Sequence, residues 1–289
     1  MNIKLFLTAA IALIVGLTAC NKEESLSQDG LPVNAVRITA SVGNPFATTR
    51  SNPVGAVEMQ GKFNSGDKIL VTKGSDYTHV VYHLDGTTWK PTGNKHHLWA
   101  NNSESFEARY PANEDNSQID NYIDYVQNNQ STLENLSKSD LMYCSIEKAP
   151  KGEPINFVME RQTSRIIVNI AGFNAEFPAG SKVKDVRVVG KDYNDTYIYI
   201  PYAQYPQGEG EIGSNYTMLS RGSGGRKYHI TLKVGEKEMR SPNLPDMEWG
   251  KSYTFNLIVG KEKLEIGSVS VADWTGSVDL DEDEADEVF

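Results

Sequence analysis

The chain has 289 residues, which is long enough for two domains of ordinary size. It contains 38 Asp and Glu against 28 Lys and Arg, and the resulting charge of −10 disfavours binding to nucleic acid or to anionic lipid headgroups. Only two cysteines occur, Cys20 and Cys144, so stability has to come from burial and strand pairing rather than from a disulfide framework.

The first twenty residues have the layout of a secretory signal. Lys4 precedes an apolar run from Leu5 to Leu17, and small residues then lead to Cys20. The run is shorter than the roughly twenty residues that span a bilayer. Because the small residues end on a cysteine, the run Leu17–Cys20 resembles a bacterial lipobox. The resemblance implies that residues 1–19 are a signal peptide and that Cys20 carries lipid such as palmitate; the alternative is an ordinary hydrophobic N-terminus.

Residues 20–33 are polar and without period, which is typical of a lipidated tether. After Asn21 the sequence Lys22-Glu23-Glu24 resembles the signal that sends Bacteroidetes lipoproteins to the outer face of the cell. We therefore expect an outer-membrane lipoprotein that is exposed on the cell surface. Lipid on Cys20 would leave Cys144 without an intramolecular disulfide partner.

The first strand is predicted from a period of two. Val36, Ile38, Ala40 and Val42 alternate with polar residues, which indicates a half-buried strand over 36–42. Further strands are predicted at 68–73, 77–84, 87–90, 97–99 and 105–110, with Asp85-Gly86 as a hairpin turn. Residues 112–140 are polar and predict a long excursion with at most a weak helical turn. These elements predict an N-terminal β-sandwich domain over 34–155.

A second block of strands begins near Ile155. Short apolar segments separated by turn residues predict a C-terminal β-sandwich domain over 156–278. An acidic stretch at 279–289 is typical of a solvated, disordered tail and lacks the ligand spacing of a calcium loop. The predicted strands are 156–159, 165–170, 184–190, 196–200, 216–219, 227–234, 253–259, 263–266 and 269–274.

Sequence signals for catalysis are weak. Residues 208–213 spell G-x-G-x-x-G, but no strand–helix context surrounds them, so a flexible loop is the better interpretation. The five histidines do not show metal-ligand spacing, and no local motif marks Cys144 as a nucleophile. We therefore expect no enzymatic activity, no metal and no cofactor.

Four tryptophans suggest an alternative role. A surface platform of indole rings could bind glycan, although in β-sandwiches such residues more often pack in the core. The four residues are Trp89, Trp99, Trp249 and Trp274.

An ordered series of short stretches resembles the fimbrillin-like lipoproteins of Bacteroidetes, the subunits of type V pili and their relatives. The series starts with the lipobox, the tether and the alternating first strand, and it covers nearly the whole mature chain. Its other members are Thr49-Arg50, Phe63–Ile69, Trp89-Lys90-Pro91, Phe106–Pro111, Asn129-Gln130-Ser131, Ser139–Tyr143, Arg161–Ile166, Leu244–Phe255 and Val271–Trp274. The second half begins with Glu160-Arg161-Gln162 where many relatives carry a histidine.

The resemblance implies an all-β fold of two tandem transthyretin-like Greek-key β-sandwich domains. It also implies assembly by donor-strand exchange, in which a protease cuts after Arg50 and Ser51 becomes the first residue. The first strand, with Val36, Ile38, Ala40 and Val42, then leaves, and a strand of another fimbrial subunit takes its place. The alternative is an uncut, non-polymerising surface lipoprotein that binds glycan or another host or bacterial surface ligand.

Overall fold

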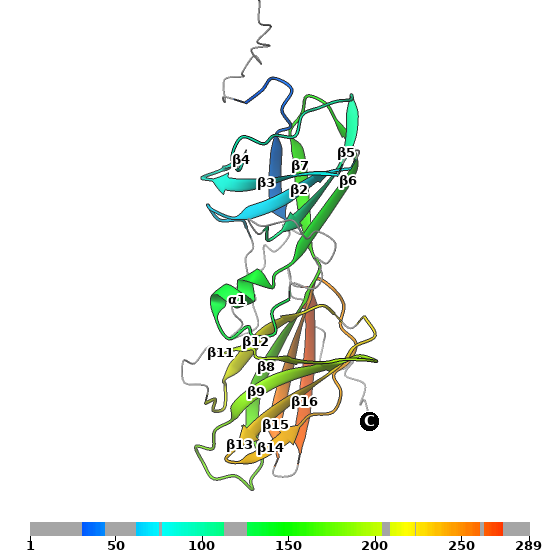
Figure 1. The fold of residues 1–289 in the computed structure, drawn as a ribbon. Coiled ribbons are helices and arrows are strands. Elements are labelled where there is room, and N and C mark those ends of the chain that lie inside the picture. Colours follow the sequence, from blue (N-terminus) through cyan, green and yellow to red (C-terminus); the bar gives the residue numbers. More distant parts are fainter. Residues whose placement is uncertain are drawn as a thin grey trace, which may run out of the picture.

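The computed structural model describes residues 31–43, 62–74, 77–112, 126–203, 209–222, 224–260 and 263–273. Within these residues nearly all regular structure is β, which confirms the predicted all-β class. Two β-rich halves follow one another along the long axis of the molecule, and the short helix α1 (Leu133–Lys138) lies between them (Figure 1).

The first half is a seven-stranded sheet in the order β1-β7-β6-β5-β2-β3-β4. The predicted hairpin is confirmed: Asp85 pairs with Thr88, and Gly86 takes the positive φ of 61° that the tight turn requires. The strands are β1 (Ile38–Val42), β2 (Lys68–Lys73), β3 (Thr78–Asp85), β4 (Thr88–Pro91), β5 (Ser103–Tyr110), β6 (Met142–Pro150) and β7 (Ile155–Arg161).

The second half contains two sheets. One has the order β10-β9-β13-β14, and the other has the order β11-β12-β8-β15-β16, with β8 and β15 parallel. The strands are β8 (Ser164–Phe173), β9 (Lys184–Lys191), β10 (Thr196–Tyr199), β11 (Tyr202–Ala203), β12 (Asn215–Ser220), β13 (Lys227–Val234), β14 (Lys237–Arg240), β15 (Lys251–Val259) and β16 (Leu264–Asp273).

The last strand differs from its prediction. The two strands expected at 263–266 and 269–274 form the single strand β16, because a bulge accommodates the glycine between them. Asn256 of β15 pairs with Ser268 and Leu257 pairs with Ile266, so Gly267 is the extra residue. A bulge of this kind bends a strand without ending it.

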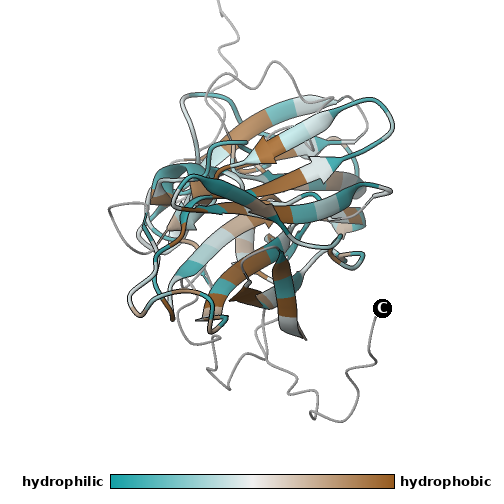
Figure 2. Cartoon of the chain, turned by 90° about the horizontal axis from the view of Figure 1, so that it is seen from below, coloured by the Kyte–Doolittle hydropathy of each residue, from teal (hydrophilic) through white to brown (hydrophobic). Residues whose placement is uncertain are grey.

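Each half has its own hydrophobic core. The first is built around Phe106, Phe157 and Met159, and the second around Ile166, Val168 and similar residues. Apolar and polar segments alternate along the strands, which is the pattern of strands with one buried face (Figure 2). Residues of β7 such as Phe157 belong to the first core, so 156–161 pack with the first half and not with the second.

The segment between the halves is tied to the second half by Gln130. The side-chain amide of this fully buried residue donates to the carbonyl oxygen of Leu219 (2.8 Å), and its oxygen accepts from the Leu219 N–H (2.8 Å). Val126 and Leu141 pack in the second core. From 126 onward the predicted excursion therefore packs on the second half, and Gln130 bonds to the backbone near the end of β12.

Helix α1 is capped at its N-terminus by the side chain of Thr132. The Thr132 side chain accepts a hydrogen bond from the Asn135 N–H (3.2 Å) and so caps the helix. Thr132→Ala is expected to reduce the free energy of unfolding by about 1 kcal/mol. Urea unfolding would measure the change, with Ser137→Ala on the exposed side of the same helix as the control. An equal loss in both variants would contradict the capping role.

Candidate functional site

Strand β1 occupies one edge of the first sheet and runs parallel to β7. Ile38 lies opposite Ile155, and Val42 lies opposite Met159. The Ile155 N–H donates to the Arg37 carbonyl (2.8 Å), and the Gly43 N–H donates to the Met159 carbonyl (2.7 Å). β7 therefore provides one hydrogen-bonding edge for the start of the described chain.

A second edge holds the residues just before β1. The Val36 N–H donates to the His97 carbonyl (2.7 Å), and the Trp99 N–H donates to the Asn34 carbonyl (3.0 Å). We call residues 34–42 the N-terminal strand and residues 97–101 the strap. The strap replaces the expected strand at 97–99, of which only a bridge between Leu98 and Ala35 forms.

The inner face of the N-terminal strand belongs to the first core. Val36, Ile38 and Val42 are buried, and Ala40 is half-buried and packs against the same cluster. The strand prediction from the period of two is confirmed for Ile38–Val42. Burying a Val or Ile side chain contributes about 1.5–3 kcal/mol, so these residues hold the strand against the core. Its withdrawal would open an apolar slot between β7 and the strap.

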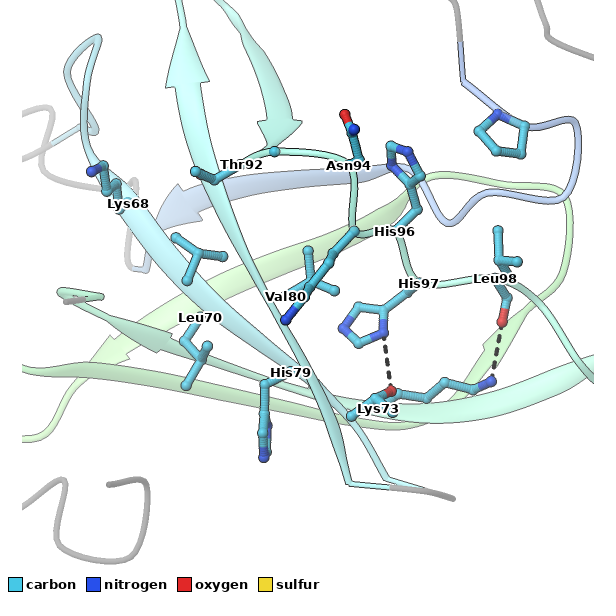
Figure 3. A pocket seen from close by; sticks show the side chains of 15 residues that line it. Lys68, Leu70, Lys73, His79, Val80, Thr92, Asn94, His96, His97 and Leu98 are labelled. Atoms are coloured by element: carbon cyan, nitrogen blue, oxygen red, sulfur yellow. Dashed lines mark hydrogen bonds between the residues drawn. The ribbon is translucent and has the colours of Figure 1, made fainter. Parts of the chain in front are cut away.

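Two buried side chains, Lys73 of β2 and Glu104 of β5, hold the strap in place. The Lys73 ammonium donates to the Leu98 carbonyl (3.0 Å; Figure 3). It also forms an ion pair with Glu104 (3.1 Å), and both side chains of the pair are almost fully buried. Glu104 in turn accepts from the Ala100 N–H (3.4 Å) and from the Asn101 side-chain amide (3.2 Å). None of these bonds involves the N-terminal strand.

Two rings complete the slot. His97 bonds to the Val71 carbonyl through Nε2 (2.9 Å), and because a carbonyl only accepts, Nε2 carries the proton. The Tyr82 hydroxyl donates to the Val36 carbonyl (3.5 Å), and burial raises the pKa of Tyr82, which keeps this donor protonated. Sequence analysis missed Lys73, His97 and Glu104 as residues that fix the strap, because no local pattern marks them for this role.

Other predicted residues lie elsewhere. Cys20, Arg50 and Ser51 fall outside the described residues, as does Trp274. Trp89 and Trp99 are buried in the first core, and Trp249 is half-exposed in the second half, where its N–H donates to the Arg221 carbonyl (2.6 Å). The described tryptophans therefore do not form one platform.

The remaining candidates are the Cys144 thiol, groups that could bind a metal ion and helices that could span a membrane. Cys144 is half-buried on β6, and burial raises the pKa of its thiol, which disfavours the reactive thiolate. Among the described residues, no three His, Cys, Asp or Glu side chains come together as a metal site. No helix in that part of the chain is long and apolar enough to cross a membrane.

The fold resembles that of solved proteins. A proposed cell adhesion protein from Bacteroides ovatus matches with a TM-score of 0.57 and 14% identity, covering 83% of this chain and 97% of that one. A second, from Bacteroides uniformis, matches with a TM-score of 0.54 and 15% identity, covering 86% and 99% of the two chains. At this identity the likeness establishes the fold.

Sequence comparison gives the family. A search of curated proteins finds no match. The family model described as fimbrillin-like matches residues 49–274, which is most of the chain. This range spans β2 to β16, and so both halves of the fold. The chain therefore belongs to the fimbrillin-like family.

Proposed function

We propose that the chain is a structural or accessory subunit of a cell-surface fimbria, a type V pilus, that assembles by donor-strand exchange and mediates adhesion. One observation carries the proposal. The N-terminal strand lies between two edges, β7 and the strap, and the strap has its own buried anchors in Lys73 and Glu104. A slot whose walls do not depend on its occupant is suited to exchange one strand for another.

The exchange would follow the physics of strand addition. Backbone groups of Met159 and His97, which now bond to the N-terminal strand, would bond to an incoming strand, and its alternate side chains would fill the places of Val36, Ile38 and Val42. An empty slot exposes unpaired edges and would promote aggregation, so removal of the resident strand has to be timed. Cleavage after Arg50, with Ser51 as the new first residue, supplies that timing.

The cellular setting is part of the same proposal. Residues 1–19 direct export, lipid on Cys20 attaches the uncut precursor to the outer membrane, and the cut subunit is released into the fimbrium. The two halves act as transthyretin-like domains that meet between Arg161 and Ser164, since β7 belongs to the first sheet and β8 to the second. The partners are other fimbrial subunits, and no cofactor is involved.

The decisive test is the N-terminus of the protein from intact cells. N-terminal sequencing and intact mass are expected to show a chain that starts at Ser51. In SDS gels of unheated samples, this chain is expected to form a ladder of SDS-resistant oligomers. Arg50→Ala is expected to abolish both the new start and the ladder. Arg240→Ala, which removes an exposed arginine from the second half, is the matched control and is expected to retain both.

The opposite outcome has a definite meaning. A wild-type protein that keeps lipid on Cys20 and remains at full mature length would contradict exchange of the N-terminal strand. The alternative, a non-polymerising surface lipoprotein, would then hold.

A further inference from the structure

A hollow opens where β4 separates from β3. Regular pairing of the two strands ends at Tyr82 and Pro91, with one further bond from the Thr92 N–H to the Val81 carbonyl (2.7 Å). β3 continues to Thr78, whereas the chain after Thr92 turns away to reach the strap. The space between them is a hollow of about 1290 Å³ (Figure 3).

The hollow is cationic in an acidic protein. Lys68, Lys73 and Lys95 line it, and no Asp or Glu does, although the chain has 38 of them. Lys73 is engaged by Glu104 beneath the strap, but Lys95 is exposed. The positive charge of Arg109 also acts here: burial first and Arg109 second lower the pKa of His79, a further lining residue. Opposite charge in a ligand would be attracted to this place.

Its lining also has hydrogen-bonding capacity. The Nδ1 atom of His96 is buried, and no hydrogen-bond partner for it is found. Asn94 and the hydroxyl of Thr92 lie beside it on the loop, and His79 lies across the hollow on β3 (Figure 3). Buried polar atoms in native proteins nearly always have a partner, so we expect the His96 ring to turn toward the hollow and donate to an acceptor of a bound molecule.

We propose that the hollow binds the acidic segment 279–287 of a second copy of this chain. The segment carries Asp279, Asp281, Glu282, Asp283, Glu284, Asp286 and Glu287, and no Lys or Arg follows Lys263. The carboxylates of this segment have the opposite charge to the lysines of the hollow, and they can accept a hydrogen bond from the His96 ring. The volume exceeds that of a single-ion site and admits several residues of an extended peptide.

The distances favour a second copy as the donor of the segment. β16 ends at Asp273 opposite Lys251, next to Gly250, whose N–H donates to the Thr163 carbonyl where the two halves meet. The hollow extends from Lys68, near that joint, to the strap at the other end of the first sheet. β5 spans that sheet with eight residues, about 26 Å at 3.3 Å per residue. The five residues 274–278 reach at most about 18 Å, so only the later part of the segment could reach Lys95 and His96 of its own chain, whereas a second copy can place the whole segment there.

The inference does not rest on strand exchange. Apart from Pro32, every residue that lines the hollow lies between Lys68 and Leu98, and none belongs to the N-terminal strand. Failure of Arg50 cleavage would therefore leave this proposal standing, and failure of the peptide to bind would leave strand exchange standing.

The first experiment measures binding of a fluorescein-labelled peptide of residues 276–289. The receptor is the full chain with the seven tail acids changed to Asn or Gln, called the tail-neutral chain. Anisotropy is expected to show saturable binding that weakens about tenfold in Lys95→Glu. Lys148→Glu, at an exposed lysine of β6 outside the hollow, carries the same charge change and is expected to bind as the parent does. Raising salt from about 50 to 200 mM should weaken binding several-fold.

Two results would overturn the inference at this stage. One is no binding by the peptide, including the case in which an acidic saccharide such as tetragalacturonate binds in its place and depends on Lys95. The other is equal weakening by Lys95→Glu and Lys148→Glu, which would show a general charge effect.

The second experiment tests whether the segment comes from another copy. The Lys95→Glu chain has an intact tail and a damaged hollow, and the tail-neutral chain has the reverse. In sedimentation velocity each is expected to remain monomeric alone, and the mixture is expected to form a 1:1 complex. A mixture that stays monomeric, with a monomeric wild type, would contradict binding between copies.

Discussion

Replacing Glu104 by Ala is expected to lower the free energy of unfolding by about 3–5 kcal/mol. The change leaves the Lys73 ammonium buried, with 6% of its side chain exposed, and removes the carboxylate that faces it at 3.1 Å. It also deprives the Ala100 N–H of its acceptor. Because the bond from Lys73 to the Leu98 carbonyl holds the strap, the loss is expected to start there.

Hydrogen exchange locates the effect. The Val36 and Trp99 amides, which join the N-terminal strand to the strap, are expected to lose protection in Glu104→Ala before the rest of the sheet does. Asp85→Ala breaks an exposed pair with Lys90 in the same sheet, and its cost is expected to stay within about 1 kcal/mol. A second variant, Lys73→Met with Glu104→Leu, removes both charges and is expected to recover much of the loss.

The result bears on how the slot works. If the strap loosens in Glu104→Ala while the remaining strands stay protected, its anchors act on the slot and not on the whole sheet. A loss below about 1 kcal/mol would contradict the view that the strap is fixed by a buried ion pair.

Strands with one buried face could be predicted from the sequence, since they repeat every two residues. β1 and β7 alternate buried and exposed side chains, and both were predicted close to their bounds. β6 was not predicted, because Ser145, Glu147 and Lys148 interrupt its apolar residues and its buried positions do not alternate regularly. It forms because β5 pairs along its length, and such support from a neighbour is invisible in the strand's own sequence.

The slot was only half predictable. The N-terminal strand carries the pattern itself, but its second wall is a strap without strand periodicity, held by side chains from β2 and β5. Lys73 and Glu104 are 31 positions apart, and their contact exists only after the sheet has formed. Charged residues in strands normally indicate a solvated face, so this pair carried no local signal.

The joint between the halves depends on a second buried ion pair. Arg161 at the end of β7 donates through Nε to Asp140 (3.0 Å) and through a terminal nitrogen to the same carboxylate (3.1 Å), with both side chains buried. Burial raises the pKa of Asp140, and the Arg161 guanidinium opposes that rise. Arg165 of β8 lies close enough to interact electrostatically with Asp140 and Arg161, and burial lowers the pKa of Arg165 to about 10.

Asp140→Ala is accordingly expected to cost about 3–5 kcal/mol, because it leaves two buried guanidinium groups without their carboxylate. Urea unfolding would measure the loss. Glu134→Ala, which breaks the exposed pair with Lys138 on neighbouring α1, is the control and is expected to cost about 0.5 kcal/mol or less.

A double variant separates the ion pair from a simple loss of packing. Asp140→Leu with Arg161→Met replaces the pair by apolar side chains of comparable shape and length and removes one charge of each sign, so it is expected to be more stable than Asp140→Ala. A double variant as unstable as the single one would assign the cost to Arg165, which also donates to the Ser252 hydroxyl (2.8 Å). Because Asp140, Arg161 and Arg165 belong to the connecting segment, β7 and β8 respectively, either result identifies which contact couples the two halves.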